Sequence, residues 1–290
     1  MTASRRRAEA AVAAAAATAA TGALWTGVIE PRRLRVRRVA IELAGWPEVL
    51  AELRVALVAD LHAGAPHVDE RRVERVVAAV NRTEPDLVAL LGDYIDPEVA
   101  LGERVEPEAV AARLGELESP LGAFAVLGNH DWRHDGERVR RALVEQRIEV
   151  LENDAVSINL GGEVLWLVGL ADAGEREPDT TTPFGLVAAS APLIVLSHNP
   201  DVFPRLPDRP LLALAGHTHG AQVNLPVLRE RVTPSRYGDR YAGGLACRGE
   251  RVMYVSRGIG TSGLPIRLLA PPEALVLTFR SRSASGRPRG

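Results

Sequence analysis

A short apolar run closes with polar residues in the stretch Arg54-Val-Ala-Leu-Val-Ala-Asp-Leu-His62. An apolar run of this length, bounded by polar residues, is typical of a strand that is buried on both faces. In open α/β sheets, ligands bind outside the carboxyl ends of such strands. The stretch therefore predicts a buried strand over 54–59 and places Asp60 and His62 at the functional edge of a sheet.

Helices and strands alternate after this stretch. Val73, Val76, Val77 and Val80 recur at helical spacing, which predicts an amphipathic helix over 69–82. Further helices are expected over 107–118 and 138–147, and further strands over 87–91, 123–127, 156–160, 164–170, 193–197, 211–215, 252–256 and 274–279. A βαβ first half followed by a strand-rich second half predicts layered α/β architecture with more than one sheet.

Composition excludes several classes of protein. The 290-residue chain has 35 basic and 37 acidic residues, a net charge of −2 and only 4% aromatic residues, so we expect no nucleic-acid partner. Every basic residue is arginine, which indicates a compositional bias, and arginine clusters by themselves therefore carry little weight. Cys247 is the single cysteine, which excludes an intrachain disulfide framework and a multi-cysteine zinc site.

The N-terminus differs from the rest of the chain. Three arginines over 5–7 precede an uncharged, alanine-rich run over 10–29, whose roughly 20 residues could just cross the apolar core of a bilayer. Three interpretations remain open for residues 1–30: a signal-anchor helix, a cleaved export signal and a soluble helix. Arginines follow the run as well, so the membrane orientation is open. The domain is expected over 31–280, and the tail over 281–290 is expected to be disordered.

Potential metal ligands gather where the predicted strands end. The clusters are Asp60-Leu61-His62, Gly92-Asp93, Gly128-Asn129-His130-Asp131, Ser197-His198-Asn199 and Gly216-His217-Thr218-His219. Each pair alone is a weak signal, but five of the seven histidines lie in these clusters. Oxygen and nitrogen ligands without cysteine suit Mn, Fe, Zn or Co. Seven such ligands are too many for one ion and suit two divalent ions bridged by a carboxylate.

The order of these five clusters resembles that of the calcineurin-like metallophosphoesterase superfamily. The resemblance covers the chain from about Arg54 to Phe279. It implies two mixed β-sheets packed as a sandwich and flanked by helices, in four layers. It also implies that Asp60, His62 and His219 bind a first metal, that Asn129, His198 and His217 bind a second, that Asp93 bridges them, and that His130 assists the leaving group and is oriented by Asp131.

The expected activity is hydrolysis of a phosphoric ester or anhydride, as in a phosphodiesterase or pyrophosphatase. We expect a metal-bound hydroxide to attack phosphorus. Arg257 and Gly258 are candidates for binding substrate phosphate through backbone amides, although the glycines here could equally just shape a turn. A non-catalytic metal-binding scaffold is the alternative from another class, but no ligand is missing.

The N-terminal segment and the stretch over 256–261 resemble the membrane-anchored bacterial branch of the superfamily. Some members of that branch cleave the pyrophosphate of a nucleotide-linked acylated sugar. A UDP-2,3-diacylglucosamine-type pyrophosphatase acting on a lipid-linked substrate is therefore a second candidate. Membrane association through the N-terminal segment is expected, with export as the alternative.

Overall fold

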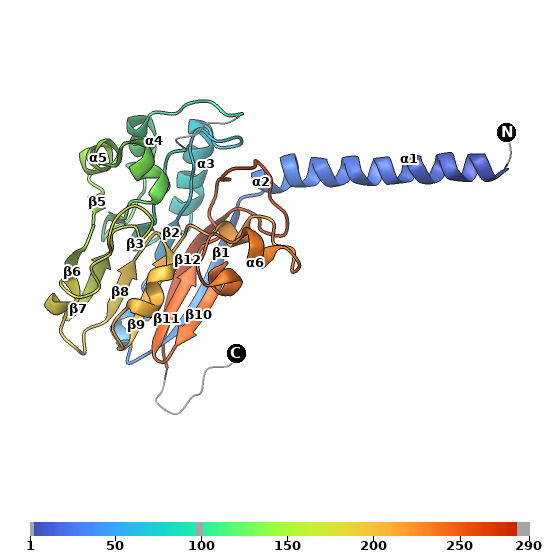
Figure 1. Cartoon of the computed structure of the whole chain (residues 1–290). Helices are drawn as coiled ribbons and strands as arrows, with labels where there is room; N and C mark the ends of the chain where they lie inside the picture. Colours follow the sequence, from blue (N-terminus) through green and yellow to red (C-terminus); the bar gives the residue numbers. More distant parts are fainter. Residues whose placement is uncertain (1–2, 97–100, 283–290) are drawn as a thin grey trace.

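The computed structural model describes the backbone of residues 3–96 and 101–282, which form two six-stranded sheets packed face to face (Figure 1). The first sheet contains β1 (Arg35–Ala44), β2 (Val55–Val58), β3 (Leu87–Leu90), β4 (Ala123–Ala125), β5 (Glu149–Val150) and β12 (Glu273–Arg282). The second contains β6 (Asp154–Leu160), β7 (Glu163–Gly169), β8 (Leu193–Leu196), β9 (Leu211–Ala215), β10 (Gly244–Arg248) and β11 (Arg251–Val255). Their strand orders are β1-β12-β2-β3-β4-β5 and β10-β11-β9-β8-β7-β6.

Both sheets are mixed, and their central strands are parallel. β2, β3, β4 and β5 run parallel, whereas β12 pairs antiparallel with β2. In the second sheet, β7, β8, β9 and β11 run parallel, and the edge strands β6 and β10 are antiparallel to their neighbours. The parallel strands therefore carry their carboxyl ends to one edge of each sheet, where the polar clusters follow.

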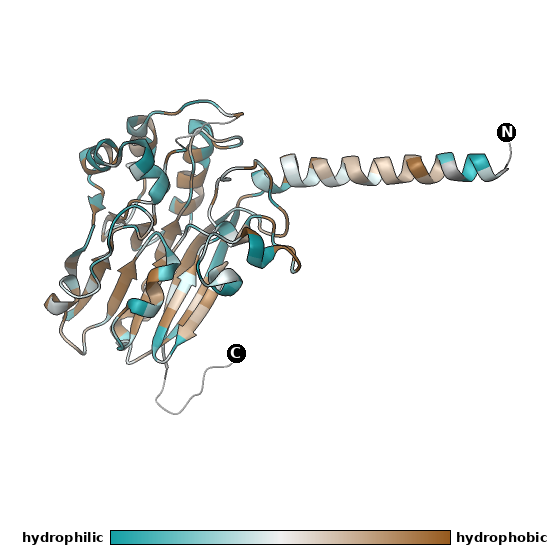
Figure 2. Ribbon diagram, in the orientation of Figure 1, coloured by the Kyte–Doolittle hydropathy of each residue, from teal (hydrophilic) through white to brown (hydrophobic). Residues whose placement is uncertain are grey.

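The main core lies between the two sheets, and alternation along each strand builds it. On β2, Val55 and Leu57 face the second sheet, while Ala56 and Val58 face the helices on the other side. Side chains of a strand alternate between its faces, so a strand that is apolar throughout must be covered on both. The expectation of a buried strand over 54–59 is confirmed, and apolar residues colour the central strands in Figure 2.

Helices cover the outer face of each sheet. α3 (Glu70–Asn81), α4 (Pro107–Leu114) and α5 (Asn129–Glu145) pack on the first sheet. Short helices, including η3 (Pro183–Leu186) and η4 (Pro200–Arg205), cover the second. The predicted fold class is therefore confirmed, with single-turn and 3-10 helices forming the fourth layer.

Two predicted helices have different bounds from those expected. α4 ends at Leu114, not at 118, because Gly115 occupies its C-cap. α5 begins at Asn129, nine residues before the predicted start, and is interrupted at Asp135. The Asp135 carboxylate accepts a hydrogen bond from the Arg138 amide and so caps the second segment, which is the part that the apolar periodicity could reveal.

The remaining differences concern short strands and the C-terminus. β5 and β10 were not expected. β5 has only two residues and β10 has five that are largely exposed, so neither shows a clear alternation of apolar and polar residues. β12 runs to Arg282, so the first two residues of the expected tail pair with β1. Residues 283–290, the rest of that tail, lie outside the described residues.

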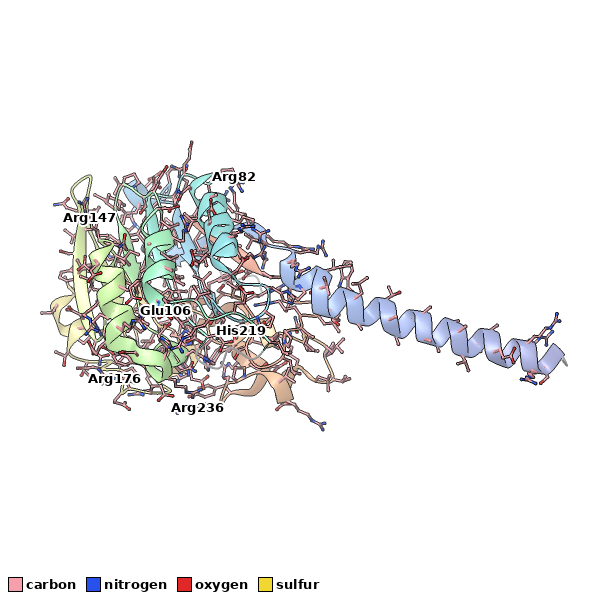
Figure 3. The ribbon with its side chains drawn as sticks, turned by 90° about the horizontal axis from the view of Figure 1, so that it is seen from above. Arg82, Glu106, Arg147, Arg176, His219 and Arg236 are labelled. Carbon is pink, nitrogen blue, oxygen red and sulfur yellow. The ribbon has the colours of Figure 1, made fainter. Side chains whose placement is uncertain are left out.

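The N-terminal helix projects away from the domain in both the side view and the view from above (Figures 1 and 3). It comprises α1 (Ala3–Leu24), a π-helical turn η1 (Trp25–Ile29) and α2 (Glu30–Arg32). The stretch Ser4–Arg32 is long and apolar enough to cross a membrane, by length and composition only. In contrast to the exposed helix, Glu30 and Pro31 at its end are buried against the domain.

Candidate metal centre

Loops from both sheets meet at the carboxyl ends of the parallel strands, and backbone hydrogen bonds fix them to one another. The Asp60 amide donates to Gly92 O at 3.0 Å, and the His62 amide donates to Asp93 O at 2.9 Å. In the second sheet the Gly216 amide donates to His198 O at 3.0 Å. The loops after β2, β3, β8 and β9 are thus held in register by their backbones.

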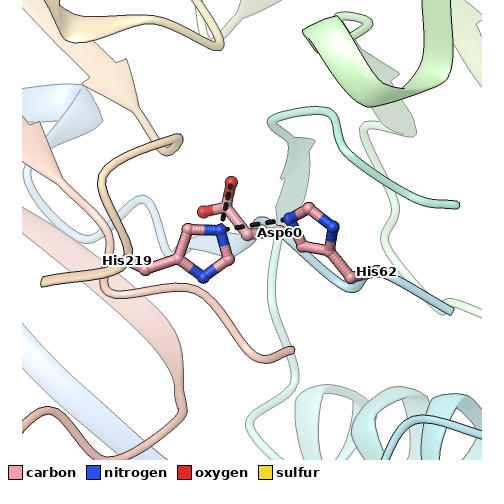
Figure 4. A group of neighbouring side chains, drawn as sticks. All are labelled: Asp60, His62 and His219. Atoms are coloured by element: carbon pink, nitrogen blue, oxygen red, sulfur yellow. Dashed lines mark hydrogen bonds and ion pairs between the residues drawn. The ribbon is translucent and has the colours of Figure 1, made fainter. Parts of the chain in front are cut away.

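A first group of potential ligands comprises Asp60, His62 and His219 (Figure 4). Nε2 of His62 lies 3.1 Å from Nε2 of His219, which in turn lies 3.9 Å from Oδ1 of Asp60. All three side chains are buried, and Oδ2 of Asp60 is one of the buried oxygens that have no hydrogen-bond partner in the described structure. Three donor atoms therefore converge on one point from two sheets.

A second group surrounds Nε2 of His198. This atom lies 3.2 Å from Oδ2 of Asp93, 3.2 Å from Oδ1 of Asn129 and 3.1 Å from Nδ1 of His217. Oδ2 of Asp93 also lies 3.5 Å from Nε2 of His62, so this carboxylate stands between the two groups. The structure thus brings together all seven residues that the sequence singles out as ligands.

Hydrogen bonds outside the groups orient the rings and carboxylates. Nδ1 of His198 lies 2.8 Å from Leu91 O, and since a carbonyl only accepts, Nδ1 carries the proton and Nε2 faces the other donor atoms. Oδ1 of Asp60 accepts from the His217 amide at 2.8 Å. A ring nitrogen that donates to a backbone carbonyl while the other faces inward is the usual arrangement of a metal-binding histidine.

Burial and mutual charge shift the titration of these groups. Burial raises the pKa of Asp60 to about 7 and lowers the pKa values of His62 and His217 to about 3. Burial opposes charge on His198 and Asp93 as well, yet their attraction raises the pKa of His198 well above its usual value and lowers that of Asp93 well below its own. Three electron-rich atoms packed around Nε2 of His198 describe a site that favours a cation.

Backbone strain is concentrated at the same residues. Asp60, His62, Asp93, His217 and His219 all have positive φ, between 47° and 72°. Left-handed backbone at a residue with a side chain costs about 1–3 kcal/mol and persists where the surroundings enforce it. Five strained residues in one site indicate that the orientation of these side chains is maintained at a cost in folding stability.

His130 and Asp131 lie in the first turn of α5, and one part of their expected relationship is wrong. The His130 ring lies 4.7 Å from the His62 ring, and Nδ1 of His130 is buried with no hydrogen-bond partner in the described part of the chain. The Asp131 carboxylate therefore does not orient His130. Its oxygens instead accept from the amides of Gly128, Asp93, Tyr94 and Ile95, at 2.8–3.3 Å. The physical reason is that Asp131 at the third position of a helix folds back onto the N-terminal amides.

The expectation that the backbone amides of Arg257 and Gly258 bind phosphate is also wrong, because both amides already donate hydrogen bonds within the protein. The Arg257 amide donates to Oε1 of Glu273 and the Gly258 amide donates to Oγ of Ser256. Gly258 has φ +66°, and a Cβ there would lie 2.6 Å from Cβ of Asp60. Gly258 therefore shapes the loop that packs against Asp60, which was the alternative interpretation.

Two buried charged residues beside the site were missed from the sequence. Asp172 follows β7, is fully buried and has one carboxylate oxygen without a partner among the described residues. Arg267 is fully buried, donates to Gly260 O and Ala270 O, and places a guanidinium nitrogen 3.4 Å from Nδ1 of His219. Asp172 follows a predicted strand, as the other clusters do, so its position was a usable signal; Arg267 lies in an irregular loop and gave none.

The donor set fits divalent metal ions. Two nitrogens each about 2.1 Å from one cation lie roughly 3 Å apart at about a right angle, close to the spacings found here. Imidazole, carboxylate and amide donors without sulfur suit Mn, Fe, Zn or Co. The unpartnered Oδ2 of Asp60 and the shared position of Asp93 give a second, independent sign that the site suits cations.

Comparison with known proteins agrees with this geometry. The model of the calcineurin-like phosphoesterase family matches residues 53–221, more than half of the chain. The chain belongs to the calcineurin-like phosphoesterase family. It is a metallophosphoesterase, an enzyme that hydrolyses phosphoester bonds.

The sequence of this metallophosphoesterase aligns with those of three relatives over most of both chains. An uncharacterized metallophosphoesterase of Bacillus subtilis is 30% identical over 90% of this chain and 93% of its own length. A phosphodiesterase of Escherichia coli, YaeI, is 33% identical over 81% of this chain and 85% of its own. A UDP-2,3-diacylglucosamine pyrophosphatase of Chlamydia trachomatis, LpxG, is 27% identical over 88% of this chain and 92% of its own.

Proposed function

We propose that this metallophosphoesterase is a binuclear phosphodiesterase or pyrophosphatase. The observation that carries the proposal is the placement of Asp93, whose Oδ2 lies within 3.5 Å of Nε2 of both His62 and His198. Asp60, His62 and His219 would hold one cation, Asn129, His198 and His217 the other, and Asp93 both. When bound, the cations would activate water and neutralise charge on the phosphoryl oxygens.

The chain's own residues supply orientation and a proton. His130 would donate a proton to the departing oxygen, because its ring stands beside the first group and is partly accessible, whereas every proposed ligand except His217 is buried. Asp131 would keep the loops after β3 and β4 in register through the four amides that it binds. Arg257, whose side chain packs beside Gly220 next to His219, remains a candidate for substrate phosphate.

The relatives support a diester or an anhydride as the substrate class. One relative is named a phosphodiesterase, and another a pyrophosphatase of a diacylated nucleotide sugar. A lipid-linked substrate is the second candidate, and the apolar helix Ser4–Arg32 favours it, because an anchored enzyme meets such substrates at the membrane.

We propose that this helix is retained as a membrane anchor and not removed as an export signal. Its end is built into the domain: Oε1 of Glu30 accepts from the Ala270 amide at 2.9 Å, and Oε2 accepts from the Trp25 indole at 2.7 Å. The Arg267 amide donates to Thr26 O at 2.9 Å. Cleavage in this region would leave the loop of Arg267, which also contacts His219, without its support.

The test compares metal content and hydrolysis of a chromogenic phosphodiester. Asp93→Asn and His198→Ala should each lose bound metal and reduce the rate at least about 100-fold, because each removes an anionic or nitrogen ligand. His134→Ala is the matched control, since His134 lies on α5 outside both groups. Wild-type rates in both ligand variants would overturn the enzyme proposal, and metal binding without any hydrolysis in the wild type would favour the scaffold.

A further inference from the structure

A cavity of about 540 Å³ lies at the foot of the N-terminal helix. Four basic residues line it: Arg32 at the end of α2, His67 in the loop after β2, and Arg72 and Arg75 in α3. Asp69 and Glu103 supply the acidic residues of its lining. None of the seven proposed metal ligands lines this cavity, although the loop over 64–68 begins two residues after His62.

The arginines of this cavity outnumber the two acidic residues that line it, Asp69 and Glu103. No ion pair joins Arg32, Arg72 or Arg75 to a carboxylate among the residues that the structure describes. Oδ1 of Asp69 accepts from the Arg72 backbone amide at 2.8 Å and so serves as the cap of α3. Three guanidinium groups thus share one cavity with two carboxylates, which leaves a net positive charge.

Arg72 shows that this cluster is more than a compositional bias. Its side chain is only 4% exposed, whereas Arg71, Arg75 and Arg32 lie in solvent. Its Nη1 donates to Arg32 O at 3.1 Å and its Nη2 donates to Pro31 O at 3.5 Å, but its Nε is buried and has no hydrogen-bond partner in the described structure. Burial, with repulsion from Arg75 and Arg32, lowers the pKa of Arg72 to about 10. A buried guanidinium with an idle donor is costly unless an anion completes it.

The N-terminus of helix α3 opens on the same cavity, and the Asp69 carboxylate that caps it offsets part of its positive potential. The helix is 12 residues long, and its first turn opens beside the same arginines. Backbone amides at a helix N-terminus carry partial positive charge and favour phosphate-type anions. The guanidinium of Arg72 and the exposed Arg32 and Arg75 therefore point to an anionic ligand.

We propose that this cavity binds the phosphate of an anionic phospholipid headgroup. Arg32 is the last residue of the helix Ser4–Arg32, so in an anchored protein it lies where the apolar span ends and the headgroups begin. A headgroup bound here would contact α2, α3 and the loop after β2 at once. It would fix the anchor against the domain and hold the loop that carries His62. The proposal rests on the anchoring proposed above but not on the hydrolytic activity.

The experiment uses the full chain in a neutral detergent and three probes: dioctanoyl phosphatidylglycerol, dioctanoyl phosphatidylcholine and inorganic phosphate. We expect the anionic lipid to bind at least about tenfold more tightly than the zwitterionic one, because the unbalanced arginines favour net negative charge. Arg75→Gln and Arg32→Gln should each weaken binding of the anionic lipid about tenfold, the usual loss for a hydrogen bond between charged groups.

Arg71→Gln is the matched control, because it removes the same charge from an exposed position of the same helix that does not line the cavity. Asp93→Asn should keep lipid binding while it loses metal, which separates this proposal from the hydrolytic one.

Equal weakening of lipid binding by Arg71→Gln and Arg75→Gln would show diffuse surface attraction and overturn the site. Tight binding of inorganic phosphate that depends on Arg75, with no gain from lipid, would overturn the lipid assignment.

Discussion

The backbone amide of Asp93 donates a hydrogen bond of 2.8 Å to the carboxylate of Asp131. The two aspartates belong to different loops, after β3 and at the start of α5. A second hydrogen bond joins the same two segments in the opposite direction: the His130 amide donates to Oδ1 of Asp93 at 2.9 Å. Asp131 therefore holds the backbone of Asp93, and the His130 amide holds its carboxylate, which is the one that would bridge two cations.

Asp131→Asn should damage both stability and metal binding. An amide offers one acceptor oxygen to four backbone N–H groups and turns its own N–H toward some of them. We expect the free energy of unfolding to fall by about 2–3 kcal/mol. We also expect metal affinity to fall about 10- to 100-fold, as for other groups that orient ligands. Urea denaturation and metal titration measure the two effects.

Asp154→Asn is the control for this change, since Asp154 lies exposed at the start of β6. It should alter unfolding by no more than about 0.5 kcal/mol. If Asp131→Asn binds metal with the wild-type affinity, the loop-positioning role of Asp131 is wrong.

Gly258→Ala and Gly263→Ala separate backbone strain from crowding of the site. Both glycines have left-handed backbone, with φ of +66° and +69°. A Cβ at Gly258 would lie 2.6 Å from Cβ of Asp60, whereas one at Gly263 would meet nothing within 4 Å. Both variants should lose about 1–2 kcal/mol of stability from the backbone. Gly258→Ala should also displace Asp60 and reduce the rate more than about tenfold, because overpacking forces a shift of the neighbour.

The measurements are thermal unfolding and phosphodiester hydrolysis at saturating metal. Comparable rates in the two alanine variants would mean that Gly258 has no role in placing Asp60.

The clustering of the seven candidate ligands was predictable because each follows a strand, and parallel strands bring distant residues to one edge. Asp60 and His219 are separated by most of the chain, yet both follow inner strands of their sheets. The same logic could have found Asp172, which follows β7. Local pattern therefore suffices where a regular element aims the side chain.

Hydrogen-bond partners could not be predicted in the same way. Asp131 was expected to contact His130, its neighbour in the chain, but it binds amides of the loop over 93–95. Gly258 was a candidate to offer its amide to a phosphate, but Ser256 occupies that amide. Which partner a donor finds depends on how loops fold over one another, and periodicity carries no information on that. Arg267 shows the same limit, since its partners come from irregular segments.

Asp172 should make the metal-free protein less stable as the pH rises. Burial raises its pKa above 3.8, so the folded state retains a proton that the unfolded state releases. The penalty is absent below the unfolded pKa and grows as the pH rises through the interval up to the folded pKa. Asp172→Asn removes the charge and keeps an oxygen for the amides of Gly174 and Glu175. The variant should therefore gain stability relative to the wild type between about pH 4 and neutrality.

Denaturation of the metal-free proteins at several pH values checks this. A stability difference that is independent of pH would mean that Asp172 titrates normally in the folded state.

His130→Ala should affect substrates according to their leaving groups. Alanine keeps the backbone amide that binds Asp93, so the variant removes only the imidazole. If His130 gives a proton to the departing oxygen, a diester with an alkyl leaving group should be hydrolysed about 10²- to 10⁴-fold more slowly. A nitrophenyl diester should be affected far less, because nitrophenolate departs without a proton. Metal content should stay at the wild-type level in this variant, and His134→Ala should change neither rate. An equal loss on both substrates would show that the ring acts through its contact with His62, 4.7 Å away between ring centres, and not as the acid.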